Sequence, residues 1–205
     1  MLSTDEFYKK MDINKLIKSR LYSEELGINL KEKSDKELFK WLLASILFGA
    51  RISESTAKKT YKTFEKYNIL APEKILRAGW EFLVNPIMRE GGYVRYDEKT
   101  STQILRNCGT FIKKYNGSFD GLLNKAQNNQ DIENKLMEFY GIGPITANIF
   151  LRELRPFWKK VNPEPLLAVK KLAEKYNINI NSYDRKKITF IRLESGLIRL
   201  MHQKK

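Results

Sequence analysis

A glycine-containing turn between two predicted helices carries the groups best suited to bind an anion. One helix is predicted to end at Tyr140, Gly141 and Gly143 form a tight turn, and a second helix starts at once. Two glycines let the backbone approach another surface without obstruction from Cβ atoms. The amides from Gly143 to Thr146 would then point outward without partners, and a phosphate fits such a helix N-terminus. The alternative is an ordinary tight connection between two helices.

The charge of the chain favours a polyanionic partner. Lys and Arg number 38 against 24 Asp and Glu, which gives a formal net charge of +14. From Arg155 to Lys205 there are 13 basic and 4 acidic residues, a surplus of 9. Such a surface attracts nucleic acid and releases counterions on binding. A Lys-rich solubilising surface is the alternative, and an anionic membrane is less favoured. Phe157 and Trp158, between basic residues, would form a stacking platform or pin a linker to the core.

Hydrophobic spacing predicts helices along the whole chain. From Trp41 to Ala50 only Ser45 is polar, so a helix over 37–48, capped by Asp35, is predicted to be buried on all sides. Ser53 and Pro72 suit the starts of the next two helices. Further helices are predicted at about 99–115, 119–126, 131–139, 144 onward, 166–176 and 184–202. No series of alternating strands with hairpin turns is present, so the chain is predicted to be all-α.

Composition limits the class of protein. The chain has 205 residues, 42% of them hydrophobic and 24 aromatic, which fits one folded domain or two small lobes sharing a core. No apolar run reaches the ~18–20 residues needed to cross a bilayer, and the N-terminus has no signal-peptide pattern, so an intracellular, cytoplasmic location is expected. The single cysteine, Cys108, excludes an internal disulfide and suits a small core position. His202, the single histidine, is expected to be solvated or packed.

The turn also resembles a known motif. Residues 139–148 resemble the helix–hairpin–helix of the endonuclease III-like DNA glycosylases (the HhH-GPD superfamily), whose pattern is roughly Leu-Pro-Gly-Val-Gly-x-Lys-Thr-Ala. Residues 42–53 are similar to the buried helix of that family, and residues 91–99 to its Gly-x-Tyr turn. The resemblance covers about 38–168. It implies that 1–205 form one unit of two helical lobes with a DNA-binding cleft between them, 1–37 and 169–205 completing one lobe.

The resemblance implies binding roles for particular positions. The amides of Gly141, Gly143 and Ile145, at the turn that Thr146 closes, would hold a phosphate of double-stranded DNA. Arg51 stands where relatives place a side chain that fills the gap left by an extruded base. Its planar guanidinium could stack there and donate to an orphaned base. A plain phosphate contact or a surface ion pair is the alternative for Arg51.

Two further sets of residues follow from the resemblance. Tyr93 and Tyr96 would line a DNA-facing turn, unless they serve as packing residues. The backbone carbonyls of Met137, Phe139 and Ile142 match positions that hold a monovalent cation in some relatives. No other cofactor is implied, because an iron–sulfur cluster would need four cysteines. A monomer is expected.

The catalytic positions depart from the family pattern. Strand-cutting relatives use a hairpin lysine, whose amine attacks the sugar and forms a Schiff base. This chain has Ile145 at that position, so lyase activity is not expected. Relatives also need a carboxylate shortly after the hairpin, where Glu164 lies, with Asn162 close by. Glu164 would assist the attack of water, and the alternative is a surface acid near the next helix. Asn162 would orient water, although it carries no charge.

These features together predict a DNA-binding protein of base-excision repair. If active, it would be a monofunctional glycosylase that hydrolyses the N-glycosidic bond of a damaged or mispaired base, associated with the nucleoid. The alternative is a catalytically inactive, glycosylase-like protein that binds DNA without altering it. RNA binding is less favoured, because the hairpin motif is typical of DNA recognition.

Overall fold

The computed structural model describes residues 12–203, with side chains up to Met201. The N-terminal segment without a signal-peptide pattern and the side chain of His202 lie outside the described residues. The helices are α1 (Ile13–Ile17), α2 (Tyr22–Leu26), α3 (Asp35–Gly49), α4 (Glu54–Lys66), α5 (Pro72–Phe82), α6 (Arg89–Gly91), α7 (Asp97–Tyr115), α8 (Asn129–Met137), α9 (Pro144–Arg152), α10 (Leu167–Lys175) and α11 (Ile188–Gln203). Short helical turns lie at Leu30–Glu32, Leu83–Met88, Asp120–Asn124 and Ile180–Ser182. Within residues 12–203 there is no strand, so the all-α prediction is confirmed.

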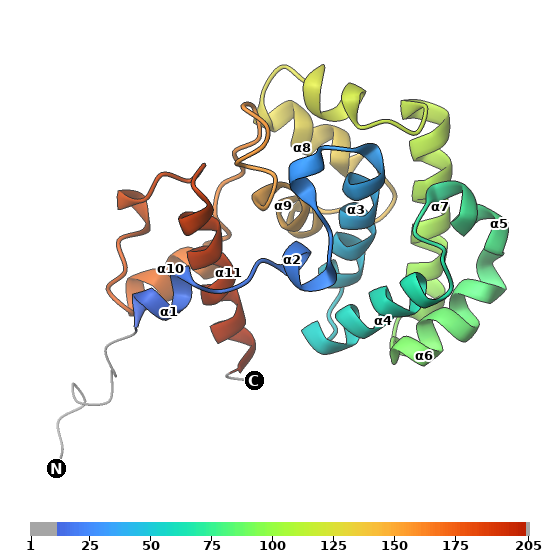
Figure 1. Cartoon of the computed structure of the whole chain (residues 1–205), viewed down its shortest axis with the longest axis horizontal. Coiled ribbons are helices and arrows are strands. Elements are labelled where there is room, and N and C mark those ends of the chain that lie inside the picture. Colours follow the sequence, from blue (N-terminus) through green and yellow to red (C-terminus); the bar gives the residue numbers. More distant parts are fainter. Residues whose placement is uncertain (1–11, 204–205) are drawn as a thin grey trace, which may run out of the picture.

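The helices pack around α3, and the last helices of the chain lie beside the first. α3 contacts α4, α7 and α9, and α5 packs along α7. On one side of the molecule, α1 and α10 pack against α11, so the first and last described helices lie together (Figure 1). Ion pairs from Arg192 to Glu24 (2.9 Å) and from Arg199 to Glu25 (3.1 Å) join α11 to α2. These contacts tie both ends of the described chain to the rest of the fold.

Local capping explains where several helices begin. The Ser53 hydroxyl accepts the amide of Thr56 at 3.0 Å, as its position predicts, and Pro72 occupies the first turn of α5. The predicted cap Asp35 is wrong, because Ser34 caps α3 instead and accepts the amide of Glu37. The Asp35 carboxylate accepts the amide of Phe119 at 2.7 Å, a contact between residues 84 positions apart.

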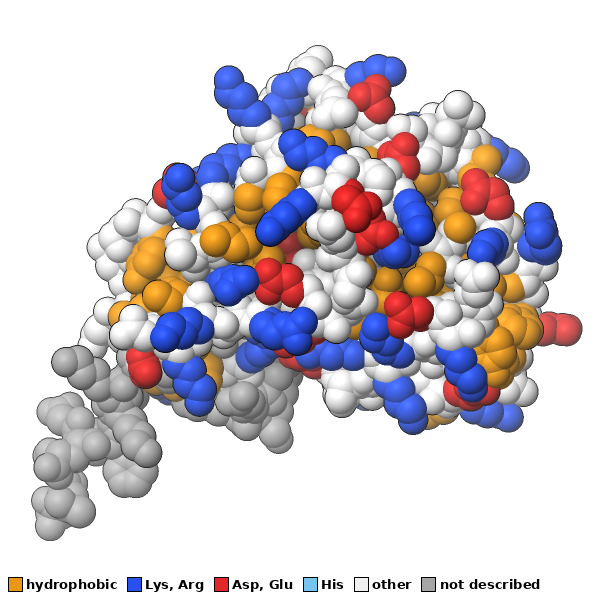
Figure 2. Space-filling view, viewed as in Figure 1, with side chains coloured by type: hydrophobic (Ala, Val, Ile, Leu, Met, Phe, Trp, Pro, Cys, Tyr) orange, Lys and Arg blue, Asp and Glu red, His pale blue; other side chains and the backbone are white. Residues whose placement is uncertain are grey.

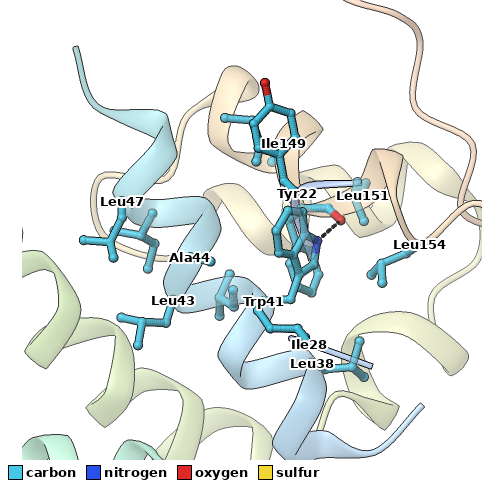
Figure 3. Close-up of a cluster of buried hydrophobic side chains, with 14 of the residues drawn as sticks. Tyr22, Ile28, Leu38, Trp41, Leu43, Ala44, Leu47, Ile149, Leu151 and Leu154 are labelled. Atoms are coloured by element: carbon cyan, nitrogen blue, oxygen red, sulfur yellow. Dashed lines mark hydrogen bonds between the residues drawn. The ribbon is translucent and has the colours of Figure 1, made fainter. Parts of the chain in front are cut away.

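The core centres on Trp41 of α3. Its side chain is fully buried, and its indole N–H donates to the carbonyl of Phe150 in α9 at 2.9 Å (Figure 3). A buried indole needs such a partner, so the bond also fixes how α3 and α9 pack. The surrounding apolar side chains are Tyr22, Ile28, Leu38, Leu43, Ala44, Leu47, Ile149, Leu151 and Leu154. The expectation that this helix is buried on all sides is confirmed along most of its length.

The surface carries both signs of charge. Figure 2 shows Lys and Arg side chains spread over the viewed face, with Asp and Glu between them. Some of the lysines are ion-paired, such as Lys62 with Glu65 and Lys135 with Asp131. Over residues 12–203, no helix has the length and apolar character required to cross a membrane.

Candidate nucleic-acid interface

The turn between α8 and α9 leaves a set of backbone amides without acceptors. Gly141 has a φ of 70°, which favours glycine, and Gly143 is the N-cap residue of α9. No side chain caps α9, and Pro144 at its first position has no N–H. Within the described part of the chain, the amides of Gly141, Gly143, Ile145 and Thr146 donate to no acceptor. Unsatisfied donors at a helix N-terminus attract an anion.

Helix α7 supports this turn from behind. The side-chain amide of Asn107 donates to the carbonyl of Tyr140 at 3.1 Å, and the guanidinium of Arg106 lies 4.4 Å from the ring centre of Tyr140. A Cβ atom on Gly141 would lie 2.9 Å from the side-chain carbon Cδ of Gln103. The backbone of the turn therefore lies directly on α7, and its position is fixed by that helix.

The end of α3 meets the start of α9 at an equally close contact. A Cβ atom on Gly49 would lie 2.1 Å from the hydroxyl oxygen of Thr146, whose side chain is buried there. Arg51 follows two residues later, is exposed, and forms no ion pair within residues 12–203. The structure therefore places Arg51 beside the segment that carries the free amides.

The turn after α6 joins the same region, but Tyr93 does not face outward. Tyr93 is fully buried, and its hydroxyl donates to the carbonyl of Leu47 at 3.4 Å. Burial raises the pKa of Tyr93 to about 12. The DNA-facing role expected for its side chain is therefore corrected to the packing role. Tyr96 is half-buried, with the Arg95 guanidinium 5.2 Å from its ring centre.

Three segments that are distant in sequence thus lie next to one another: 47–51, 91–96 and 140–146. Around them, four exposed cations have no carboxylate partner within the described chain: Arg51, Arg95, Lys99 and Arg106. Backbone donors with unpaired cations on the same and adjoining segments form a surface suited to a phosphate chain.

Glu164 lies in a different environment. Its carboxylate forms ion pairs with Lys170, at 2.9 Å, and with Arg185. The hydrogen bond from Lys170, followed by that from Arg185, lowers the pKa of Glu164 below its usual value. The carboxylate is therefore ionised at neutral pH and accepts no hydrogen bond from the hairpin amides. The three side chains line a pocket of about 220 Å³ together with Pro165, Ile180, Asn181, Tyr183 and Phe190.

The backbone around Glu164 is nevertheless tied to α9 and to the core. Asn148 of α9 donates its side-chain amide to the Glu164 carbonyl at 2.7 Å. Arg155 donates to the Pro163 carbonyl at 2.6 Å. The amide of Asn162 donates to the side chain of Asn129 at 2.8 Å, which holds that residue in the linker. The segment is thus fixed, while the Glu164 side chain turns to α10 and the loop before α11.

The carbonyls expected to hold a monovalent cation belong to Met137, Phe139 and Ile142. The Phe139 carbonyl accepts the amide of Ile142 at 3.1 Å within the turn. Residues 12–203 contain no cluster of three or more His, Cys, Asp or Glu side chains that could hold a metal ion. A site made of backbone carbonyls needs no such side chains, so the monovalent-cation site stays a prediction.

The chain was compared with protein-family models, curated proteins and solved structures. None matches. The relation of the hairpin to the DNA glycosylases therefore stays a prediction, and the site rests on its own contacts.

Sequence reasoning missed two structural roles near the site. Arg155, expected to be part of a basic surface, is fully buried and forms an ion pair with Glu194 of α11. An acid within the apolar run of α11 was the available signal, because a buried carboxylate requires a partner. The second role is that of Asn148, whose side chain binds the Glu164 carbonyl, and no sequence pattern indicated it.

The structure also decides between the two roles predicted for Trp158. Its side chain is buried, and its indole N–H donates to Asn124 at 3.0 Å, so Trp158 packs in the core.

Proposed function

We propose that this chain binds double-stranded DNA and holds a backbone phosphate at the turn between α8 and α9. The observation that carries the proposal is the uncapped N-terminus of α9, whose Ile145 and Thr146 amides have no acceptor within the described residues. The amides of Gly141 and Gly143 add donors on the same turn. Phosphate groups bind such termini because the N–H groups and the helix dipole both favour negative charge.

The surrounding charges support the same partner. Arg51 is fixed beside the hairpin by the contact between Gly49 and Thr146, and Arg106 lies over Tyr140. A net charge of +14 would strengthen binding to any polyanion, and the hairpin would give that binding a defined position. In the two-lobed arrangement that the resemblance implies, this surface would form the DNA-binding side of the cleft.

A charge change at Ile145 tests the proposal. Ile145 is 58% exposed at the second position of α9, where a glutamate is compatible with the helix dipole. Its carboxylate would repel a phosphate, so Ile145→Glu is expected to weaken binding to a fluorescent duplex about tenfold or more at moderate salt. The plot of log affinity against log salt is expected to lose about one unit of slope. Ile145→Lys is expected to strengthen binding.

Leu167 provides the matched control. It is 66% exposed in the first turn of α10, so Leu167→Glu makes the same change in net charge at another helix N-terminus. Fluorescence anisotropy of the three variants separates a local contact from general attraction. An equal loss of affinity in Ile145→Glu and Leu167→Glu would contradict a phosphate site at the hairpin.

Base excision is a second candidate, because the hydrogen bond from Asn148 holds the backbone of Glu164 against α9, the helix that follows the hairpin. A carboxylate that stays ionised at neutral pH can stabilise a cationic sugar or orient water. Water would add to the sugar carbon C1′ while the base leaves with the bonding electrons and takes up a proton. Because Ile145 offers no amine, the strand would stay intact. Glu164 would first have to leave Lys170 and Arg185, so this function ranks second.

Labelled duplexes carrying uracil, hypoxanthine, oxidised guanine, alkylated adenine or mismatches distinguish the two candidates. A glycosylase is expected to give strand breaks at one lesion after hot alkali only, and Glu164→Gln is expected to abolish them. Cleavage that persists in Glu164→Gln would assign catalysis to another group. Salt-sensitive binding without cleavage of any duplex would leave DNA binding as the function.

A further inference from the structure

Two aromatic side chains are exposed on opposite flanks of α7. Trp80 of α5 is 40% exposed, and its indole N–H donates to the hydroxyl of Thr102 at 3.1 Å. Tyr140 of the hairpin is 46% exposed, beneath the guanidinium of Arg106. Thr102 and Arg106 are separated by about one helical turn, a rise of about 6 Å along one face. The two rings therefore contact neighbouring turns of the same helix.

The backbone holds both rings in place. Gly79 has a φ of 78° and a ψ of 174°, which interrupts α5 directly before Trp80. Glycine adopts this conformation without the steric cost that other residues incur. On the other flank, Asn107 holds the Tyr140 carbonyl at 3.1 Å. Rings held in fixed positions lose little freedom when a ligand stacks on them.

Unpaired cations follow the same helix. Lys99, Arg106 and Lys113 recur every seven residues along α7, so they share one face. All three are exposed and lack a carboxylate partner within residues 12–203. Glu98, which directly precedes Lys99, is an exposed acid at the start of the helix. The face therefore combines a row of positive charges with two exposed rings.

We propose that the α7 face, defined by Trp80, Lys99, Arg106 and Tyr140, binds an unpaired DNA strand that continues from the duplex held at the hairpin. The inference rests on the proposed duplex binding. Bases inside a duplex already stack on each other, whereas unpaired bases offer their faces to aromatic side chains. Cations beside the rings would track the phosphates of that strand. The preferred substrate class is thus DNA with a junction between duplex and single strand.

The experiment compares a blunt duplex with the same duplex carrying a single-stranded extension of about eight nucleotides, at the 3′ or the 5′ end. The extension of one polarity is expected to strengthen binding by the full-length chain about tenfold. Trp80→Ala is expected to lower the affinity for the extended DNA about fivefold or more and to leave the affinity for the blunt duplex unchanged. Tyr140→Ala is expected to lower the affinity for the extended DNA by a similar factor.

Two control variants separate stacking from general effects. Trp80→Phe keeps a ring and is expected to keep most of the gain from the extension. Leu76→Ala removes another 40%-exposed apolar side chain of α5 and is expected to change nothing. Folding of each variant is checked by its thermal unfolding midpoint.

Each outcome decides the inference. Equal affinity for blunt and extended DNA in the unaltered protein would overturn it, while duplex binding could still be tested at Ile145. An equal loss on both DNAs in Trp80→Ala would assign the ring to the duplex and also overturn it. Failure to bind any duplex would instead contradict the proposed function. A gain from the extension that Trp80→Ala removes would establish the α7 face as a single-strand site.

Discussion

Glu194→Leu is expected to lower the free energy of unfolding by about 3–5 kcal/mol, because it leaves a buried guanidinium without its counter-ion. The side chains of Arg155 and Glu194 are 0% and 1% exposed, so water cannot replace the lost partner. Arg155 also holds the Pro163 carbonyl in the linker before α10. The loss of stability should therefore extend to the segment that carries Glu164. Urea unfolding followed by circular dichroism measures the change.

A double variant and a surface variant complete this test. In Arg155→Met/Glu194→Leu both charges are absent, and the apolar replacements are expected to recover most of the lost stability. Glu65→Leu removes the acid of the pair with Lys62, whose side chains are about half exposed. That change is expected to cost less than about 1 kcal/mol. A similar small cost for Glu194→Leu would show that Arg155 finds another acceptor.

Features with a local cause could be predicted from the sequence. Ser53 and Pro72 start helices because capping and proline geometry act over one turn. The run from Trp41 to Ala50 predicts a buried helix because no face of it is polar. Gly141 and Gly143 mark the turn between α8 and α9 for the same local reason. The hairpin therefore lies where its glycines predict.

Features that depend on distant residues could not be predicted. Tyr93 follows a glycine pair that suggests an exposed turn, yet its ring is buried under α3. The partners of Glu164 come from α10 and the loop before α11, so spacing from the hairpin gives no information on where its carboxylate points. Asp35 and Ser34 are both suitable caps, and the choice depends on Phe119. Sequence spacing locates a residue along the chain, whereas packing decides which way its side chain faces.

Gly49→Ala is expected to lower the free energy of unfolding by about 2–3 kcal/mol, although alanine is the better helix former. The added methyl group would lie 2.1 Å from the hydroxyl oxygen and 3.1 Å from the Cβ of Thr146. Since Trp41 already binds α3 to α9, the two helices cannot separate without losing core contacts. Gly109→Ala is the matched control, because a methyl group there meets nothing within 4 Å. That change is expected to raise the free energy of unfolding by at most about 1 kcal/mol.

A double-mutant cycle with Thr146→Ala identifies the contact. Thr146→Ala removes the hydroxyl oxygen that lies closest to the added methyl group, so Gly49→Ala should cost much less in that background. The affinity for a DNA duplex is measured in parallel. It is expected to fall in Gly49→Ala, because Arg51 shifts relative to the hairpin amides. In Gly49→Ala/Thr146→Ala it is expected to recover in part. Additive costs would mean that α3 and α9 are not in contact at these residues. A coupling of about 1 kcal/mol or more, together with the recovery of affinity, would connect the packing of two helices to the position of the proposed phosphate site.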